Sequence, residues 1–295
     1  MQLKEIYSTI RPAISIEFFP PKTEQAEAGL VARMTDFQKM KPAFCSVTYG
    51  AAGSTRDRTL DWVKRLRGEF HFEVMCHLTC VGHSRQDLDT ILRQLRSINI
   101  ENIIALRGDP PRGVDHWQRH TDGYDHAIGL VEAARSHGFS VAVAGFPETH
   151  PEAVSPESDI SFLKQKVDAG ADVVITQFFF DNDDYYRYVD NARRAGVNVP
   201  IVPGIMPFRS SEDVEKFVTL YARTFNGPAK VPARLRDLLA KVEGSPEACP
   251  QLGIDYATEQ GRDLLAHGAP GIHFYCLNQT HSVEAILRSL NLNIA

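Results

Sequence analysis

The sequence has no long apolar run, no excess of basic residues and no paired-cysteine motif, and each absence excludes a class of protein. No apolar run in the 295 residues approaches the ~20 residues that a membrane-spanning helix needs, and residues 1–9 lack the apolar stretch of a signal peptide. The 32 Lys and Arg against 37 Asp and Glu give a net charge of −5, without a basic cluster for nucleic acid or a membrane surface. We therefore expect a cytoplasmic globular protein without a nucleic-acid or membrane partner.

The sequence also lacks the spacings that mark disulfide frameworks and common metal sites. His116 and His120 stand four residues apart, but no HExxH motif accompanies them, so we expect no metal site. No CxxC pair occurs, and four of the five cysteines lie in apolar, strand-like runs, where a thiol behaves as a small buried hydrophobe. We therefore expect reduced cysteines in the core. They are Cys45, Cys76, Cys80, Cys249 and Cys276.

Eight short apolar runs, rich in β-branched and aromatic residues, recur along the chain with helical patterns between them. Most of them begin about 30 residues after the previous one, which is the length of one βα unit. Their near-continuous hydrophobicity is typical of parallel strands that are covered on both faces. The runs are residues 14–19, 44–49, 72–80, 102–106, 140–146, 172–178, 200–204 and 271–277.

The segments between these runs carry apolar residues at helical spacing. Ser84, followed three positions later by Asp87, predicts a capped helix start. Gly170 and Gly196 stand just past two further helical patterns, where glycine is favoured. The predicted helices cover residues 23–40, 84–98, 158–169 and 181–195, and residues 226–267 are expected to insert extra helices before the last strand.

The alternation of eight strands with helices predicts an α/β protein, a (βα)8 TIM barrel formed as one domain of residues 1–295. An open doubly wound sheet is the alternative, but it more often carries a G-x-G-x-x-G phosphate-binding turn near its first strand. This chain has no such motif, and Pro20-Pro21 follows its first strand. The barrel is therefore the fold that we expect.

Polar residues gather where the predicted strands end. In a barrel of this kind, the carboxyl ends of the strands form the active-site rim. These ends carry two carboxylates, an arginine, an imidazole and amides, whereas the opposite ends carry mainly Pro, Phe, Asn and Gly. The asymmetry indicates a small-molecule site at the rim. Its candidate residues are Glu17, Thr48, Tyr49, His77, Thr79, Arg107, Gly108, Asp109, Gln177 and Asn278.

Glu17 is enclosed by an isoleucine and two phenylalanines, ahead of two prolines. A carboxyl group in such surroundings is expected to be desolvated, which would raise its pKa and suit it to donate a proton near neutral pH. Arg107 and Asp109 stand two residues apart and could form a structural ion pair, or Arg107 could bind a phosphate or a carboxylate with two hydrogen bonds. The residues alone indicate a barrel enzyme with acid catalysis and an anionic ligand.

Several segments, in order along nearly the whole chain, carry motifs of one known family. They include SIEFFPPK around Glu17, SVTYGAAGS around Thr48, CHLTC around His77 and ALRGDPP around Arg107. Further motifs are FPETHPEA, DAGADVVITQFFFD, PGIMP and HFYCLN. Together they resemble the methylenetetrahydrofolate reductase family in its compact bacterial form.

This resemblance implies an FAD-dependent oxidoreductase of one-carbon metabolism and methionine biosynthesis. Such an enzyme uses NADH or NADPH to reduce 5,10-methylenetetrahydrofolate to 5-methyltetrahydrofolate. In the family, both substrates use one face of the flavin in turn, and this ping-pong order needs no separate nucleotide-binding domain. The family also implies a homo-oligomer. The lack of a clear basic cluster for a 2′-phosphate favours NADH.

The resemblance also implies roles for particular residues. Glu17 would protonate N10 of the folate and open its five-membered ring, and Asp109 would face both the pterin and the flavin. Gln177 would contact the folate, and Phe217 would meet both nicotinamide and folate, although Phe217 is equally compatible with a core position of an amphipathic helix. The implied FAD contacts are Thr48, Tyr49, Ala51, His77, Arg107, Gly108, Asp109, Tyr124, His150, Asp159 and Lys166.

Two positions depart from the family pattern. Phe146 stands where the family often has Tyr, so a contact through that phenol is missing. Gln279 stands at a substrate-binding position where bacterial members often have Arg, and an amide cannot form a salt bridge with the glutamate tail of folate.

Two other functions stay open. One is another flavin barrel that resembles proline dehydrogenase and would bind an amino-acid carboxylate. The other is a folate-binding protein without catalysis, against which Glu17 and Asp109 argue. A yellow purified protein would favour the enzymes, and a colourless one would favour the binding protein.

Overall fold

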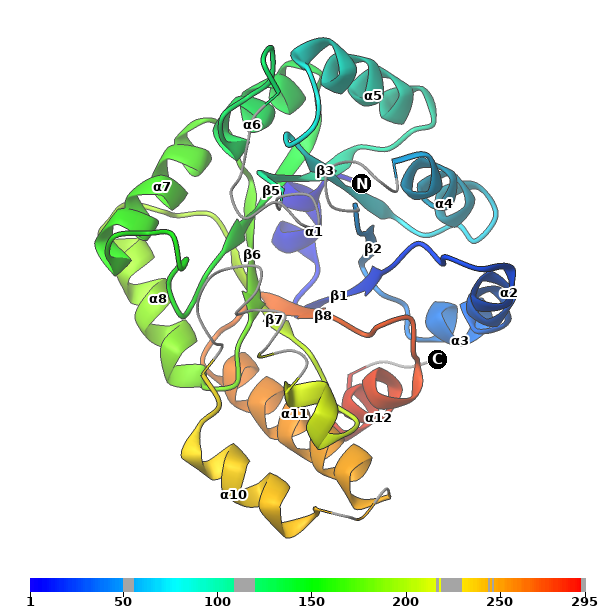
Figure 1. Cartoon of the computed structure of the whole chain (residues 1–295), viewed down its shortest axis with the longest axis vertical. Coiled ribbons are helices and arrows are strands. Elements are labelled where there is room, and N and C mark those ends of the chain that lie inside the picture. The colour runs from blue at the N-terminus through cyan, green and yellow to red at the C-terminus, as the bar shows by residue number, and fades with distance from the viewer. Residues whose placement is uncertain are drawn as a thin grey trace.

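The computed structural model describes residues 1–49, 56–108, 120–215, 218, 230–243, 245 and 247–292. Eight strands stand around a common centre with helices outside them (Figure 1). The strands pair in parallel in chain order, and β1 pairs with β8, which closes the barrel and confirms the predicted fold. The strands are β1 (Ala13–Phe18), β2 (Phe44–Val47), β3 (Val74–Thr79), β4 (Asn102–Leu106), β5 (Ser140–Gly145), β6 (Val173–Phe178), β7 (Ile201–Ile205) and β8 (Gly271–Phe274).

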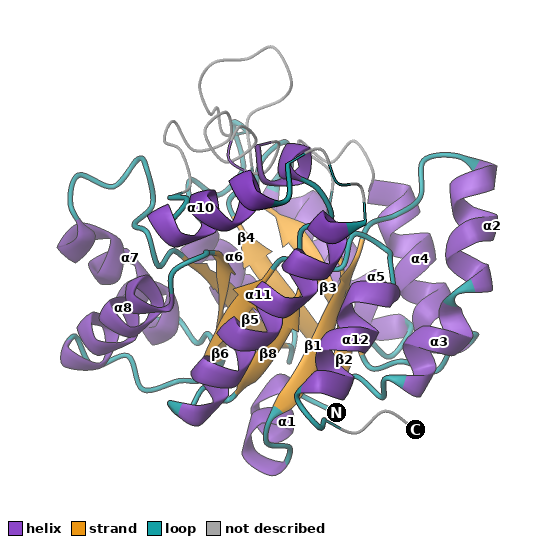
Figure 2. Ribbon diagram, turned by 90° about the horizontal axis from the view of Figure 1, so that it is seen from below, coloured by secondary structure: helices purple, strands orange, loops and turns teal. Residues whose placement is uncertain are grey.

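Most of the helices lie around the strands (Figure 1), and a side view shows them flanking the barrel (Figure 2). The predicted start at Ser84 is confirmed, because its hydroxyl oxygen accepts a hydrogen bond from the backbone N–H of Asp87 at 3.1 Å. The helices after β1 are α2 (Glu24–Ala32), α3 (Met34–Lys39), α4 (Arg56–Gly68), α5 (Arg85–Ser97), α6 (Ala127–Ser136), α7 (Pro156–Asp168), α8 (Asn182–Arg194), α10 (Ala233–Lys241), α11 (Ala248–Ala266) and α12 (His281–Ser289).

Two helices differ from the prediction. Residues 23–40 form two helices that meet at Arg33, whose Nε donates a hydrogen bond to the backbone oxygen of Asn278 at 3.1 Å. Helix α7 begins earlier than residue 158, because Ser155 caps it and Pro156 fits its first turn. Both differences arise from contacts that helical periodicity does not report.

The insertion expected over residues 226–267 contains α10 and α11. Helix α11 packs against β7 and α8, where the barrel helix between β7 and β8 is expected, and α10 packs against α11. Residues 226–229, 244 and 246 of this segment lie outside the described residues.

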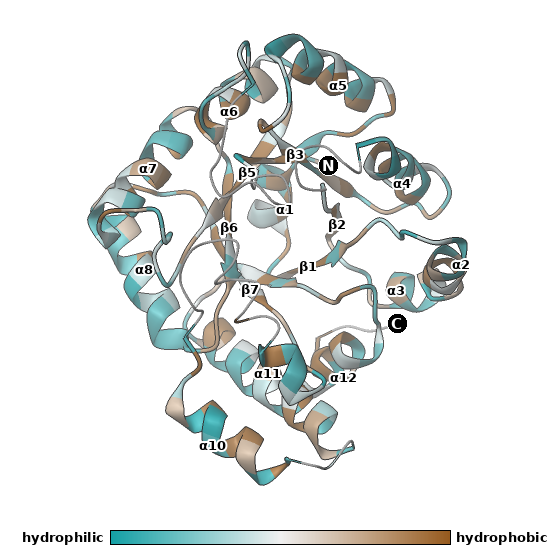
Figure 3. Cartoon of the chain, viewed as in Figure 1, coloured by the Kyte–Doolittle hydropathy of each residue, from teal (hydrophilic) through white to brown (hydrophobic). Residues whose placement is uncertain are grey.

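Each strand divides its side chains between two apolar cores. On β1, Ile16 and Phe18 face the helices and belong to the large core between barrel and ring. The alternate side chains, including Ala13, face the barrel interior. The helices are amphipathic, with hydrophilic and hydrophobic residues on different faces (Figure 3). All five cysteines are buried and none forms a disulfide, as expected for thiols that fill the core.

Helix α1 (Leu3–Thr9), which the sequence patterns did not predict, lies at the amino-terminal end of the barrel (Figure 2). Its residues Leu3, Ile6 and Tyr7 are buried and pack among the inward-facing side chains, such as Phe44 and Met75. Helix α10 lies at the opposite end of the barrel (Figure 2). The apolar face of α1 therefore closes the end that lies away from the carboxyl ends of the strands.

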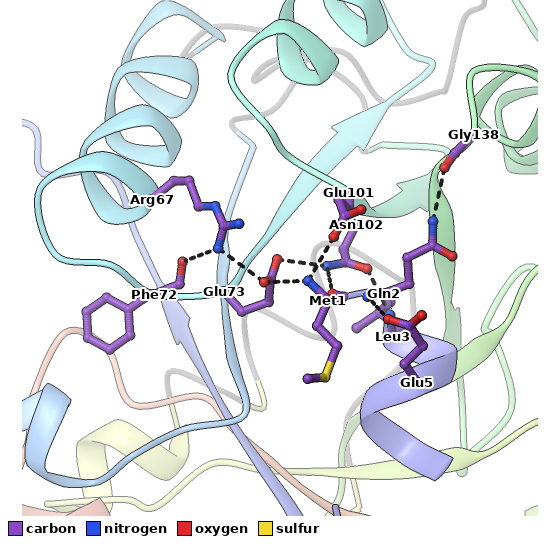
Figure 4. Close-up of polar contacts among 10 residues, drawn as sticks. All are labelled: Met1, Gln2, Leu3, Glu5, Arg67, Phe72, Glu73, Glu101, Asn102 and Gly138. Carbon is purple, nitrogen blue, oxygen red and sulfur yellow. Dashed lines mark hydrogen bonds and ion pairs between the residues drawn. The ribbon is translucent and has the colours of Figure 1, made fainter. Parts of the chain in front are cut away.

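Polar contacts fix the start of α1 beneath the strands (Figure 4). The amino group of Met1 lies 2.7 Å from Glu73 and 2.8 Å from Glu101. The side-chain oxygen of the buried Asn102 accepts a hydrogen bond from the backbone N–H of Leu3 at 2.9 Å, and its amide donates to the backbone oxygen of Met1. These contacts tie α1 to the starts of β3 and β4.

We predict that Ile6→Ala lowers the free energy of unfolding by about 2–5 kcal/mol, because it leaves a cavity beside the barrel interior. Urea unfolding measures this loss. The matched control is Lys4→Ala on the exposed face of the same helix, which should change stability by less than about 0.5 kcal/mol. Equal midpoints for the two variants would contradict the packing of α1 against the strands.

Candidate active site

A cavity of about 630 Å³ opens at the carboxyl ends of the strands, which is a volume typical of small-molecule sites. The structure brings most of the predicted site residues together around it. Apolar and aromatic side chains, among them Phe19, Phe146 and Phe162, form much of its remaining wall. The predicted residues that line the cavity are Glu17, Thr48, Tyr49, His77, Thr79, Arg107, Gly108, His150, Asp159, Lys166 and Gln177.

Three described residues of the predicted site, Tyr124, Asn278 and Gln279, are not among those that line this cavity. Ala51, Asp109 and Phe217 lie outside the described residues. Tyr124 packs under the guanidinium group of Arg85, 5.0 Å from the ring centroid, and Gln279 belongs to the turn before α12.

Glu17 lies in the barrel interior and is 5% exposed. It points inward from β1 because side chains alternate along a strand, and Ile16 and Phe18 occupy the outward positions. Its Oε2 lies 3.3 Å from Nε2 of His77 on β3 and 3.8 Å from Nε2 of His273 on β8. Two imidazoles from different strands therefore flank one buried carboxylate.

The pKa of Glu17 differs from the prediction. Burial raises the pKa of this carboxyl group, as expected, but His273 and His77 together outweigh burial and lower the pKa to about 2. The sequence expectation of a raised pKa is therefore wrong for this structure. The pKa is lowered because both imidazoles favour the ionised form of the carboxylate, and the sequence does not reveal them because they come from distant strands.

A clamp holds the end of β1 against the segment after β8. Asn278 accepts a hydrogen bond from the backbone N–H of Phe19 at 2.9 Å and donates one to the backbone oxygen of the same residue at 2.8 Å. Both Asn278 and Leu277 have positive φ angles, of 59° and 51°. This paired contact fixes the exit of the strand that carries Glu17.

Arg107 and Gly108 form the rim after β4. Nη2 of Arg107 donates to Oε1 of Glu152 at 2.9 Å, so the partner shown for this arginine is a glutamate from the segment after β5. Gly108 has a φ of +90°, and a Cβ there would lie 2.3 Å from a methyl group of Val81. Only glycine fits this position without strain.

A second polar group lies on the far wall of the cavity, between the segment after β5 and α7. Nζ of Lys166 donates to the backbone oxygen of Ala144 at 2.7 Å, and Oδ2 of Asp159 accepts from the backbone N–H of His150 at 3.1 Å. Burial lowers the pKa of Lys166 to about 8, although Asp159 acts in the opposite direction. Burial also raises the pKa of Asp159. Lys166 can therefore serve an anionic ligand in a poorly hydrated site.

Sequence reasoning missed several residues that line the cavity, among them His273, Tyr275, Glu152 and Phe162. His273 and Tyr275 stand two residues apart, and alternate residues of a strand point to the same side. Applied to the motif HFYCLN, this alternation could have predicted that both side chains face the cavity. Glu152 and Phe162 lie in a loop and on a helix, where the sequence carries no such signal. Tyr49 also has an unpredicted partner, since its hydroxyl lies 3.0 Å from Nε2 of His83.

The barrel and this cavity define a class of protein: a (βα)8 barrel with a small-molecule site at its rim, built around a buried carboxylate and two imidazoles. A family model described as Methylenetetrahydrofolate reductase matches residues 2–291. The chain belongs to this family, which confirms the resemblance that its motifs indicate.

Relatives support the same assignment. The 5,10-methylenetetrahydrofolate reductase of Escherichia coli (strain K12) is 36% identical over 279 residues, which cover 95% of this chain and 90% of the relative. The relative named Methylenetetrahydrofolate reductase (NADH) 1 from Arabidopsis thaliana is 39% identical over 303 residues, which cover 99% of this chain and 50% of the relative. The chain thus spans about half the length of its plant relatives and most of the length of its bacterial ones.

Solved structures share the barrel at low sequence identity. An uncharacterized protein from Clostridium thermocellum that binds two copies of 5-methyl-5,6,7,8-tetrahydrofolic acid has a TM-score of 0.63 at 13% identity, over 98% of both chains. A Yersinia pestis DHPS with a pterine-sulfa conjugate has a TM-score of 0.51 at 14% identity, over 95% of this chain and 93% of that one. At such identities the similarity shows the fold alone.

Within the described part of the chain, no helix combines the length and the apolar composition that crossing a membrane requires. Nor do three or more His, Cys, Asp or Glu side chains converge there in an arrangement that could hold a metal ion.

We predict that Glu17→Gln changes how the stability of the protein depends on pH. The folded-state pKa of about 2 lies below the ordinary value of 4.5, so Glu17 stabilises the fold above about pH 4.5 and loses that effect as the pH falls towards 2. Near pH 7 the variant should therefore be less stable, by an amount on the order of 3 kcal/mol. Urea unfolding at a series of pH values measures the difference, which should shrink between about pH 5 and pH 3. A difference that stays constant over this range would contradict the lowered pKa.

Proposed function

We propose that this protein is a methylenetetrahydrofolate reductase that uses NAD(P)H and FAD to reduce 5,10-methylenetetrahydrofolate to 5-methyltetrahydrofolate. Family membership and the bacterial relatives named for this reaction support the proposal. The observation that carries it is the buried Glu17, flanked by two imidazoles at the inner end of a rim cavity.

The cavity fits a flavin nucleotide. Oγ1 of Thr79 is buried at the cavity without a hydrogen-bond partner among the described residues, so it can bind a ligand, and His77 lines the cavity on the same strand. Lys166 and Arg107 supply positive charge for the diphosphate, and the aromatic side chains supply apolar surface for flat rings. With these residues, Thr48, Tyr49, Gly108, His150 and Asp159 would hold FAD. Ala51, Asp109 and Tyr124 stay predicted contacts.

The chemistry that bound FAD would supply is hydride transfer between the nicotinamide and the one-carbon unit of the folate. The protein's own part is to orient the reactants and to move one proton. Glu17 would supply that proton to N10 of the folate, which opens the five-membered ring. Gln177 would hold the folate from β6, with Asp109, Phe217 and Gln279 as further predicted contacts.

The remaining features of the proposal follow from the family. We propose that NAD(P)H and folate use the cavity in turn, that NADH is the preferred donor, and that the reaction serves methionine biosynthesis. Plant relatives named for NADH support this donor. We also propose a cytoplasmic homo-oligomer in which residues 1–295 form one catalytic domain with a helical insertion at about 226–267.

We predict that Glu17→Gln separates the two half-reactions. Flavin reduction by NADH should stay normal, because no proton from Glu17 is needed there. Reoxidation by methylenetetrahydrofolate should slow by about 10²–10⁴-fold, which is the usual contribution of a general acid. Anaerobic stopped-flow absorbance of the flavin measures both rates.

The matched control for this variant is Glu73→Gln, which removes a carboxylate at the closed end of the barrel (Figure 4). It should keep both half-reaction rates. A normal folate half-reaction in Glu17→Gln would remove the acid role from Glu17, and wild-type flavin that methylenetetrahydrofolate does not reoxidise would overturn the proposed function.

We predict that Lys166→Ala weakens FAD retention by about tenfold or more, because the cavity loses the ammonium group that would face the diphosphate. Flavin fluorescence released on dilution measures retention. Lys164→Ala is the matched control on the same helix, since Lys164 pairs with Asp168 at 2.6 Å and does not line the cavity. Equal retention in the two variants would exclude Lys166 from the FAD site.

A further inference from the structure

A second cavity lies at the opposite end of the barrel from the candidate active site. It has a volume of about 660 Å³, which is large enough for a small molecule. The ends of α4 and α5 line it, together with the segments that lead into β3 and β4. We call this cavity the basal cleft, and its polar lining residues are Lys64, Arg67, His71, Arg96, Asn99 and Glu101.

The carboxylates at the basal cleft are already paired. Glu101, which lines the cleft, lies 2.8 Å from the amino group of Met1. Glu73 lies 2.7 Å from the same amino group and 3.1 Å from Nη1 of Arg67 (Figure 4). These two cations balance the two carboxylates, so any further positive charge at the cleft is in excess.

Lys64 and Arg96 supply that excess charge. Both are exposed, and neither has a carboxylate at ion-pair distance among the described residues. The guanidinium group of Arg96 lies over the ring of the buried Phe139, with its Cζ 5.4 Å from the ring centroid. A contact of this kind uses the flat face of the guanidinium group and leaves the N–H groups at its edge to bind an anion. Arg96 is therefore held in place without its donors being used.

The carboxyl ends of α4 and α5 do not cancel this charge. A helix end carries about half a negative elementary charge, so the two ends together carry less than Lys64 and Arg96 supply. Backbone hydrogen bonds also satisfy carbonyl groups of the last turns. The N–H of Phe72 donates to the oxygen of Leu66 at 3.0 Å, and the N–H of Ile100 donates to the oxygen of Leu95 at 3.1 Å. The basal cleft therefore keeps a net positive charge.

The lining favours an anion without a large apolar part. It contains no Phe, Tyr or Trp among its described residues, in contrast to the candidate active site, and Ile98 is its one large apolar side chain there. Lys64 and Arg67 stand three positions apart on α4, so they leave the same side of that helix, whereas Arg96 comes from α5. Positive groups on two helices suit a ligand with more than one anionic group.

We propose that the basal cleft binds a small anion that carries two or more phosphate groups. A terminal phosphate group has three acceptor oxygens and a charge of about −1.5 to −2, so it can bind several donors of the lining at once. Lys64 and Arg67 would bind the anion from α4, and Arg96 would bind it from α5. Free polyphosphate and the phosphate chain of a nucleotide share this chemistry. The site lies away from the rim cavity, so this inference does not depend on the proposed function.

The test measures the binding of pyrophosphate to the full-length protein as purified, by isothermal titration calorimetry. Lys64→Gln and Arg96→Gln should each raise the Kd by about tenfold, because each removes a charged donor from the cleft. Arg93→Gln is the matched control on α5, since Arg93 pairs with Asp89 and does not line the cleft. It removes the same charge from the same helix and should keep the Kd of wild type.

Three results would overturn the proposal. Pyrophosphate could fail to bind, Arg93→Gln could weaken binding as much as Arg96→Gln does, or Lys166→Ala could abolish binding that the cleft variants keep. The last result would place pyrophosphate in the rim cavity. Should Arg96→Gln fail to fold after losing its contact with Phe139, the exposed Lys64→Gln still decides the question.

Further ligands define the anion. Orthophosphate should bind at least about tenfold more weakly than pyrophosphate, since it cannot reach the cations of both helices; equal affinities would contradict a site for two phosphate groups. Tripolyphosphate that binds as tightly as ATP would identify free polyphosphate as the ligand. Tighter binding of ATP, lost in Lys64→Gln, would identify the phosphate chain of a nucleotide, and either result supports the site.

Discussion

The register of β1 between its two neighbours is the constraint on which the site depends. Its partners on β2 and β8 place Ser15 and Glu17 inside the barrel, beside His273. A slip of one residue would turn Glu17 towards the helices and would bring Ile16 and Phe18 into the interior. Because those two apolar side chains are almost fully buried in the outer core, that slip is strongly disfavoured. The position of the acid is thus set by the hydrophobic residues around it.

Burial shapes the charges at both walls of the cavity, with different results. At Glu17 the cost of removing a carboxylate from water is offset by two imidazoles, so the ionised form persists. At Lys166 the compensation from Asp159 is incomplete, and the ammonium group loses its proton more readily than usual. The wall at Glu17 therefore carries a carboxylate whose charge is stabilised by imidazoles. The wall at Lys166 carries an ammonium group that an anionic ligand would stabilise.

Much of the fold was predictable, because parallel strands covered on both faces have a continuous apolar signature, and all eight expected runs form strands. Helix α1 escaped prediction, because a helix of seven residues has too short a pattern and owes its burial to distant strands. The rim was also predictable, since polar residues follow the strands. The pKa of Glu17 was not, because His77 and His273 approach it only after the barrel closes.

Helix α1 limits the routes by which a ligand can reach the interior of the barrel. Within the described part of the chain, Leu3, Ile6 and Tyr7 seal the floor, and the opening lies among the strand exits. Among the described residues, a ligand that lies against Glu17 would therefore enter and leave by this opening. Two ligands that need the same depth of this cavity would exclude each other there.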